Sequence, residues 1–278
     1  MGIALRDQLK SDQEKIWEDF DSCLPGEVLH FTSKDSFKGI LESQTIWCTD
    51  IRTVNDPREG DHGMDIIRRA VAKKPFSLPP NFQKFVRSHL FKGLFGLKDS
   101  YTVYIACFSV EPVSAGMWKQ YADGGNGCAI VFDYSILAKG QDNGDKYALF
   151  RVLYDRESQI RKAELTSSCA VALCKSKRLE SRDWNNYWFY EVPFALSICA
   201  LRFKDQSYPE EKEIRLYVAG GDNVSPFTAP DGRERVAVSF PKEAIVRVER
   251  PQTSALSTGE IRSTLERYGY LDLPIVEK

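Results

Sequence analysis

The chain has 278 residues, of which 42% are hydrophobic, and its 38 basic and 39 acidic residues leave a formal net charge of −1. This length and apolar content are sufficient for one large core without disulfide bonds. The near-zero charge excludes a global electrostatic field that would recruit nucleic acid or an anionic membrane.

The cysteines and the apolar stretches indicate a cytoplasmic protein without a membrane anchor. The chain has seven cysteines, an odd number, and no C-x-x-C pair. Such cysteines are typical of reduced thiols in a reducing compartment. Residues 1–20 alternate acids and bases, so we expect no signal peptide. No later window approaches the roughly 20 apolar residues of a spanning helix.

The first fifty residues predict a helix followed by a strand, a helix and a strand. Amphipathic spacing predicts a helix over Ile3–Phe20, and a Pro-Gly pair then breaks the chain. A short strand is expected at 27–32. Ser33 or Asp35 can cap the next helix, and a second strand follows at 45–49.

A polar loop and two helices come next. The loop at 50–61 is rich in residues that favour turns. Helices are expected at 64–72 and 82–94, joined by a proline-rich connector. Residues 61–98 are therefore predicted to form a helical insertion, which would act as a lid or a partner surface.

The remaining elements predict an α+β protein. We expect one domain over residues 1–278, with an N-terminal helix at 1–24 in addition to the insertion. Strands are expected at 101–109, 128–132, 148–154, 214–219, 235–240 and 244–249, and helices at 117–122, 156–179, 183–203 and from residue 258.

Familiar catalytic motifs are absent from the sequence. None of the histidines, His30, His62 and His89, has a second His or Cys at the spacing of metal ligands, so we expect no zinc site. No G-x-S-x-G elbow or G-x-x-x-x-G-K-[ST] loop occurs. The glycines at 124, 125 and 127 follow a predicted helix, which favours a helix C-cap and a turn over a phosphate cradle.

Four segments together resemble a bacterial domain family of unknown function. The resemblance covers residues 28 to about 250 and depends on the combination, because each segment alone is weak. The segments are His30-x-Thr32, the N-D-P-R-E-G loop at 55–60, the M-W-x-x-Y-A-D segment at 117–123 and the E-x-E-x-R segment at 211–215.

The opening strand with its His-x-Thr pattern also resembles the start of ADP-ribosyltransferase folds, which use a His, Tyr and Glu set. This resemblance implies an α+β core of split mixed or antiparallel β-sheets with flanking helices. It implies NAD as the substrate and no metal. ADP-ribose would pass to a protein or nucleic-acid acceptor, or to water, in a bacterial toxin or defence setting.

The resemblance also implies roles for single residues. His30 would hold the ribose next to nicotinamide, and the catalytic glutamate would be Glu211 or Glu213. Tyr121 or Trp118 would be the aromatic residue. A carboxylate is the group that this chemistry needs, because cleavage of the nicotinamide bond leaves an oxocarbenium-like ribose that a negative charge stabilises.

Five further residues are candidates for ligand binding. Thr32 completes the His-x-Thr pattern, and Asn55 and Asp56 lie in the polar loop. Arg52 and Arg215 are candidates for a diphosphate, because a guanidinium binds phosphate oxygens in pairs. We expect His30, Glu213 and the Arg52 to Asp56 region to lie around one pocket.

Structural roles explain several of these residues equally well. His30 fits a hydrogen-bonded residue at the edge of the core, and Trp118 and Tyr121 fit packing residues. Glu213 fits an ion pair with Arg215 or Arg202, which would contribute about 0 to 1 kcal/mol if it were exposed.

Two other functions stay open at this point. One is a non-catalytic module that binds a nucleotide or nucleic acid. The other is a nuclease in which Asp56, Glu59, Glu211 and Glu213 hold Mg²⁺ through their carboxylates.

Overall fold

The computed structural model divides the chain into two compact units. Each unit is assembled from three separate stretches of sequence. Unit 1 comprises Met1–Cys23, Val54–Thr102 and Val152–Tyr208, and unit 2 comprises Leu24–Thr53, Val103–Arg151 and Pro209–Lys278. The structure describes residues 2–54, 61–73, 102–111, 113–142, 147–176, 191–220 and 224–278.

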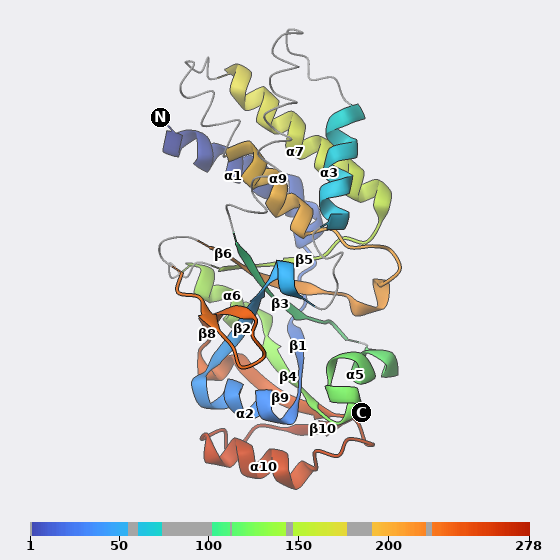
Figure 1. Ribbon diagram of the computed structural model, residues 1–278, viewed down its shortest axis with the longest axis vertical. Coiled ribbons are helices and arrows are strands. Elements are labelled where there is room, and N and C mark those ends of the chain that lie inside the picture. The colour runs from blue at the N-terminus through green and yellow to red at the C-terminus, as the bar shows by residue number, and fades with distance from the viewer. Residues whose placement is uncertain are drawn as a thin grey trace. The chain divides into compact units, whose positions relative to one another are not determined.

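Unit 2 contains two β-sheets (Figure 1). The four-stranded sheet has the order β1-β4-β9-β10 and is mixed, because β9 and β10 run parallel while its other pairs are antiparallel. The six-stranded sheet has the order β5-β6-β3-β2-β8-β7 and is antiparallel. The α+β class with mixed and antiparallel sheets is therefore confirmed. The strands are β1 (Glu27–Thr32), β2 (Thr45–Asp50), β3 (Val103–Phe108), β4 (Cys128–Asp133), β5 (Tyr147–Arg151), β6 (Ile214–Ala219), β7 (Phe227–Thr228), β8 (Glu234–Ser239), β9 (Ile245–Arg250) and β10 (Ile275–Glu277).

An isolated β-bridge joins the two sheets. Leu29 of β1 forms an isolated antiparallel bridge with Ser109, the residue after β3. The Leu29 N–H donates to the Ser109 carbonyl at 2.8 Å, and the Ser109 N–H donates back at 2.9 Å. This bridge fixes β1 against the end of β3.

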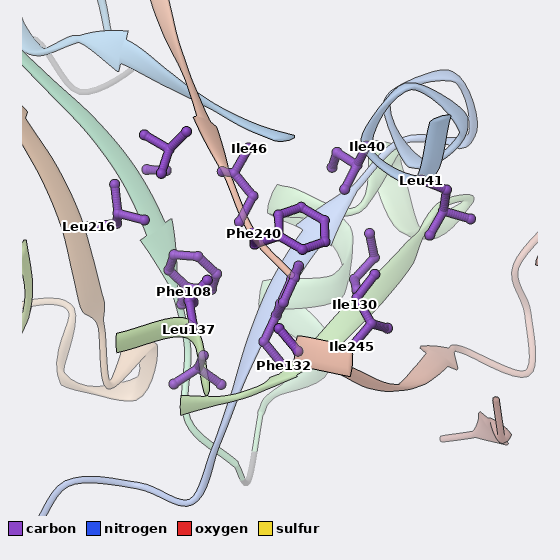
Figure 2. Close-up of a cluster of buried hydrophobic side chains, with 14 of the residues drawn as sticks. Ile40, Leu41, Ile46, Phe108, Ile130, Phe132, Leu137, Leu216, Phe240 and Ile245 are labelled. Atoms are coloured by element: carbon purple, nitrogen blue, oxygen red, sulfur yellow. The ribbon is translucent and has the colours of Figure 1, made fainter. Parts of the chain in front are cut away.

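The main core of unit 2 is formed by side chains from both sheets (Figure 2). Val28, Ile130 and Phe132 come from the four-stranded sheet, and Phe108 and Leu216 come from the six-stranded sheet. The rings of Phe108 and Phe132 meet edge to face, with centroids 5.8 Å apart. Each such side chain contributes roughly 1.5–3 kcal/mol by leaving water.

Four helices flank these sheets, and serine caps start three of them. The Ser33 side chain accepts the N–H of Ser36, so Ser33 is the cap of α2. Ser257 and Glu260 form a reciprocal capping box at α10, which satisfies two orphan backbone donors. The helices are α2 (Lys34–Ser43), α5 (Ala115–Tyr121), α6 (Tyr134–Asp142) and α10 (Thr258–Arg267).

Unit 1 is a group of helices with its own core. Trp17 of α1 is buried, and the Arg202 guanidinium lies 3.8 Å from the centroid of its ring. Arg202 also pairs with Asp21, so one arginine fixes both the ring and the end of α1. The helices are α1 (Gly2–Asp21), α3 (Asp61–Lys73), α7 (Arg156–Ser176) and α9 (Val192–Leu201). No helix in the described ranges is long and apolar enough to cross a membrane.

Some expected elements differ from the structure. The N-terminal helix and the first helix of the predicted insertion are present as α1 and α3. The helix expected at 82–94 lies outside the described residues, as does the part of the expected 183–203 helix that precedes α9. The short strands β7 and β10 and the helix α6 were not predicted.

We predict that Gly127→Ala destabilises unit 2. A Cβ atom at Gly127 would lie 2.1 Å from the Thr32 carbonyl oxygen, which is backbone and cannot move aside cheaply. The expected loss in the free energy of unfolding is about 1–3 kcal/mol, measured by urea denaturation. Gly39→Ala is the control, because a Cβ at this helical position meets nothing within 4 Å; it should stabilise α2 by up to about 1 kcal/mol. Equal urea midpoints for Gly127→Ala and wild type would contradict the packing argument.

We also predict that thiol reactivity follows burial. The six cysteines whose side chains the structure describes form no disulfide bond with one another; Cys23 and Cys107 are exposed, and Cys48, Cys128 and Cys199 are buried. Burial raises the pKa of Cys199 to about 12 and raises those of Cys48 and Cys128 as well. Since the thiolate is the reactive form, iodoacetamide at neutral pH should label the exposed pair first. Mass spectrometry of the native protein tests this, and early labelling of the buried three would contradict it.

Candidate functional site

His30 lies where β1 leaves the edge of β3. Its Nδ1 donates to the carbonyl of Cys107 at 3.1 Å, and its ring packs against Phe108 with centroids 5.4 Å apart. Residues two apart on an antiparallel strand point their backbone groups to the same edge, so this carbonyl is the next acceptor beyond Ser109. The His30 imidazole therefore donates to a carbonyl that a backbone N–H would reach if the pairing of β1 with β3 continued past the bridge.

The environment of His30 favours the neutral imidazole. Burial lowers the pKa of His30, and the bond to the Cys107 carbonyl only partly opposes this effect. Because Nδ1 carries the donated proton, Nε2 holds the lone pair in the neutral ring. Within the described ranges Nε2 has no hydrogen-bond partner. The side chain can thus accept a hydrogen bond from a hydroxyl or amide group of a ligand.

A second cluster lies on the opposite face of β1. Phe31 follows His30, so its side chain points the other way and packs on α5. Its ring meets Trp118 edge to face at 4.9 Å and lies 6.3 Å from Tyr121. The Tyr121 hydroxyl donates to Oε1 of Glu211 at 2.7 Å and accepts from the Gln120 amide at 2.9 Å.

Exposure separates the two aromatic candidates. Trp118 is 6% exposed and belongs to a small apolar cluster with Leu29 and Ala122. Tyr121 is 37% exposed, so part of its ring surface faces solvent. A ligand can stack on Tyr121, whereas Trp118 is a packing residue.

The two candidate glutamates do not share a strand face. Glu211 ends a 3-10 helix at Pro209–Glu211, and β6 begins only at Ile214. Lys212 between the glutamates has a φ of +42°, a left-handed conformation that an alternating strand does not contain. Both glutamates therefore precede β6, and strand alternation does not relate their side chains.

Glu213 is held by Arg215. The Arg215 Nε donates to Oε1 of Glu213 at 2.9 Å, and Nη2 donates to Oε2 at 3.1 Å. The two side chains are 3% and 0% exposed, so this is a buried bidentate pair. The Arg215 guanidinium is thus inaccessible to a diphosphate, and the charge of Glu213 is balanced internally.

Arg52 lies at the opposite end of β3 from His30. It pairs with the buried Asp50, Nη2 to Oδ2 at 2.5 Å, and this hydrogen bond raises the pKa of Arg52. Asp50 is the strand partner of Tyr104. Tyr104 and Cys107 are three positions apart, which is about 10 Å along the strand. Arg52 and His30 are therefore not in contact.

The structure describes only some of the other predicted site residues. The buried Thr32 donates its hydroxyl to the carbonyl of the next residue, Ser33, at 3.4 Å. Asn55, Asp56 and Glu59 lie outside the described residues. No group of three or more His, Cys, Asp or Glu side chains in the described ranges could hold a metal ion.

Sequence reasoning missed three parts of this site. They are Phe31, the amide of Gln120 and the Cys107 carbonyl. The alternation of β1 could have indicated that Phe31 and His30 face opposite sides. The Tyr121 to Glu211 contact joins residues 90 positions apart, so a single sequence carries no signal for it.

Comparison with known proteins gives one partial match. Residues 117–216 match the family described as Protein of unknown function (DUF2971). This stretch contains Trp118, Tyr121 and Glu211 but neither His30 nor Arg52. No curated protein and no solved structure matches the chain.

We predict that Arg215→Met destabilises unit 2 by about 3–5 kcal/mol, because it leaves the buried Glu213 without its guanidinium partner. The double variant Glu213→Leu with Arg215→Met should regain much of this loss. Lys38→Met is the control, since Lys38 pairs with Asp35 at 3.8 Å on the surface, and it should cost less than about 1 kcal/mol. Urea denaturation measures all three, and a loss for Arg215→Met as small as that for Lys38→Met would contradict the buried-pair argument.

Proposed function

We propose that the protein binds NAD and cleaves the bond between nicotinamide and ribose, transferring ADP-ribose to a protein or nucleic-acid acceptor or to water. The observation that carries this proposal is the contact between Tyr121 and Glu211. It combines a partly exposed aromatic ring with a buried carboxylate oriented by a hydroxyl. These are the two groups that nicotinamide-bond cleavage needs, one to stack on the base and one to face the ribose.

Glu211 is the preferred catalytic carboxylate. When the bond between ribose C1′ and the nicotinamide nitrogen breaks, the electron pair leaves with nicotinamide and positive charge develops on the ribose. A fixed carboxylate stabilises that charge more than it stabilises neutral ground-state ribose. The acceptor oxygen then bonds to C1′ and its proton passes to the carboxylate. Glu213 fits this role less well, because Arg215 already balances its charge.

His30 supports the proposal as a hydrogen-bond acceptor. Its Nε2 lone pair suits a ribose hydroxyl, and its neutral form leaves no charge to repel the cation that develops on the ribose. His30 and Tyr121 lie on opposite faces of β1, so one ligand must extend around the edge of this strand to meet both. An extended dinucleotide has that reach, and Arg52, whose side chain is 41% exposed, is the candidate for its diphosphate.

The two-sheet α+β fold and the His-x-Thr strand agree with the resemblance to ADP-ribosyltransferases. On the same basis we propose a role in a bacterial toxin or defence system. A non-catalytic nucleotide-binding module is the alternative, since the same cluster could bind NAD without cleaving it.

We predict that Glu211→Gln lowers nicotinamide release at least about 10²-fold, because the amide keeps the shape but removes the charge. Tyr121→Phe keeps the ring and deletes the hydroxyl, so it should lower kcat more than it raises KM. Glu210→Gln is the matched control, an exposed neighbour on the same turn, and should match wild type. The assay is nicotinamide release with purified protein, with circular dichroism to confirm folding.

The outcomes separate the alternatives. Wild-type release that Glu211→Gln leaves unchanged would remove Glu211 from the mechanism and make Glu213 the next candidate. Thermal stabilisation by NAD without release, with acceptors present, would support the binding module. Stabilisation by Mg²⁺ but not by NAD would favour the nuclease.

A further inference from the structure

An exposed tryptophan lies on the outer face of the six-stranded sheet. Side chains alternate along β2, so Ile46 and Cys48 point into the main core and Trp47 points to the opposite face. Trp47 is 46% exposed, although tryptophan is highly buried on average in folded proteins. Tryptophan is enriched on surfaces that contact a partner, because its ring supplies a large apolar area there.

The strand neighbours of Trp47 hold its ring without covering it. Its cross-strand partner is Ala237 of β8, the strand next to β2 (Figure 1), and the alanine side chain is too short to cover a ring. The Phe227 ring of β7 meets the Trp47 ring edge to face, with centroids 5.1 Å apart. The Arg235 guanidinium carbon lies 5.5 Å from the centroid of the Trp47 ring. The ring is therefore supported by both side chains and still exposed.

Arg235 is itself fixed by hydrogen bonds. Its Nε donates to Oγ1 of Thr49 at 3.2 Å. Its Nη1 and Nη2 donate to the two carboxylate oxygens of Asp231 at 2.9 and 2.5 Å. The guanidinium group is thus held beside Trp47, and the ring has little freedom to lose when a ligand stacks on it. Such preorganisation lowers the entropic cost of binding.

The charges beside Trp47 favour an anionic partner. Arg233 Nε lies 3.9 Å from Oδ2 of Asp231, and the Arg233 side chain is 38% exposed. Two guanidinium groups, those of Arg233 and Arg235, therefore share the single carboxylate of Asp231. Glu234 between them belongs to the other face of β8, where it accepts a hydrogen bond from the Tyr104 hydroxyl. These three side chains thus combine two positive charges with one negative charge.

The edge of the sheet beside this face is unsuited to a protein strand. β7 is the last strand of the six-stranded sheet and has only two residues, Phe227 and Thr228. Pro226 precedes it, and Pro230 follows it after one further residue. Proline has no backbone N–H to donate, so prolines at a sheet edge oppose the addition of another strand. A partner is therefore expected on the face that carries Trp47.

We propose that this face binds single-stranded nucleic acid, with one base stacked on the Trp47 ring and a neighbouring phosphate on Arg233. Every base has a π-face, so a fixed and exposed aromatic ring binds single strands with little sequence preference. A guanidinium group matches the geometry of phosphate oxygens. Because the net charge of the chain is −1, most of the affinity must come from stacking. The binding requires no NAD and does not depend on the proposed NAD chemistry.

The test is fluorescence anisotropy of a labelled single strand of about ten thymidine nucleotides, titrated with the full chain. An abasic strand of the same length keeps the phosphates and lacks the bases, so wild type should bind it at least about 10-fold more weakly. Trp47→Ala should weaken binding of the normal strand by a similar factor and leave the abasic strand unaffected. Trp47→Phe should restore part of the loss. Leu271→Ala, which removes another exposed apolar side chain, is the control and should match wild type.

Two further arms separate the contacts. Arg233→Gln should weaken the normal and abasic strands by the same factor, because a phosphate contact does not involve the base. A uridine strand of the same length tests RNA, and tighter binding of RNA than of DNA would assign a contact to the 2′-hydroxyl within the same stacking site. Circular dichroism confirms that each variant is folded.

Equal affinity of wild type for the normal and abasic strands overturns the proposal, as does the absence of measurable binding to any strand. This comparison uses wild type alone, so it decides the question if Trp47→Ala fails to fold. Sedimentation without nucleic acid tests the other occupant of the face. A wild-type dimer that Trp47→Ala converts to a monomer would show that the face binds a second copy of the chain, and the nucleic-acid proposal would be wrong.

Discussion

The bridge between Leu29 and Ser109 is the constraint on which the architecture of unit 2 depends. Its two backbone hydrogen bonds place Leu29, in β1 of the four-stranded sheet, beside Ser109, which follows β3 of the six-stranded sheet. Next to the bridge, the His30 side chain donates a hydrogen bond to the Cys107 carbonyl of β3, while the Phe31 ring packs on Trp118 of α5. The side chains of His30 and Phe31 therefore lie in two different environments: His30 at the junction of the sheets, and Phe31 in the aromatic cluster that contacts Glu211.

Local pattern predicted the strands well, whereas the contacts of the candidate site depend on tertiary structure that local pattern does not carry. Short runs such as Ile214–Ala219 form strands where expected, because apolar and β-branched side chains pack well on the half-buried surface of a sheet. Helix α6 was missed although Asp133 carries a cap signal, its carboxylate accepting the N–H of Ile136 at 3.0 Å. The left-handed Lys212 has no signature in sequence, because such positions usually carry Gly or Asn. The pairing of Tyr121 with Glu211 arises only from tertiary structure.

Three buried carboxylates of unit 2 share one local solution. Asp50, Glu213 and Glu249 each pair with an arginine two residues away, at Arg52, Arg215 and Arg247. Only Arg247 and Glu249 lie on one strand, where this spacing places both side chains on the same face. In the other two pairs a single member lies on a strand, because β2 ends at Asp50 and β6 begins after Glu213. Glu249 differs from the other two because its second oxygen lies beyond the reach of its arginine. That difference makes it the unusual member of the set.

The interleaving of the two units limits which pieces of the chain can exist alone. A fragment cut to residues 117–216, the range of the family match, would contain β4 without β1 and β9, its neighbours on both sides. It would also carry β6 without β3. Such a fragment would present open strand edges with apolar faces, which is the composition of an aggregating peptide. The boundary of the shared sequence is therefore no guide to an expressible domain, and recombination at these points would not transfer a working fold.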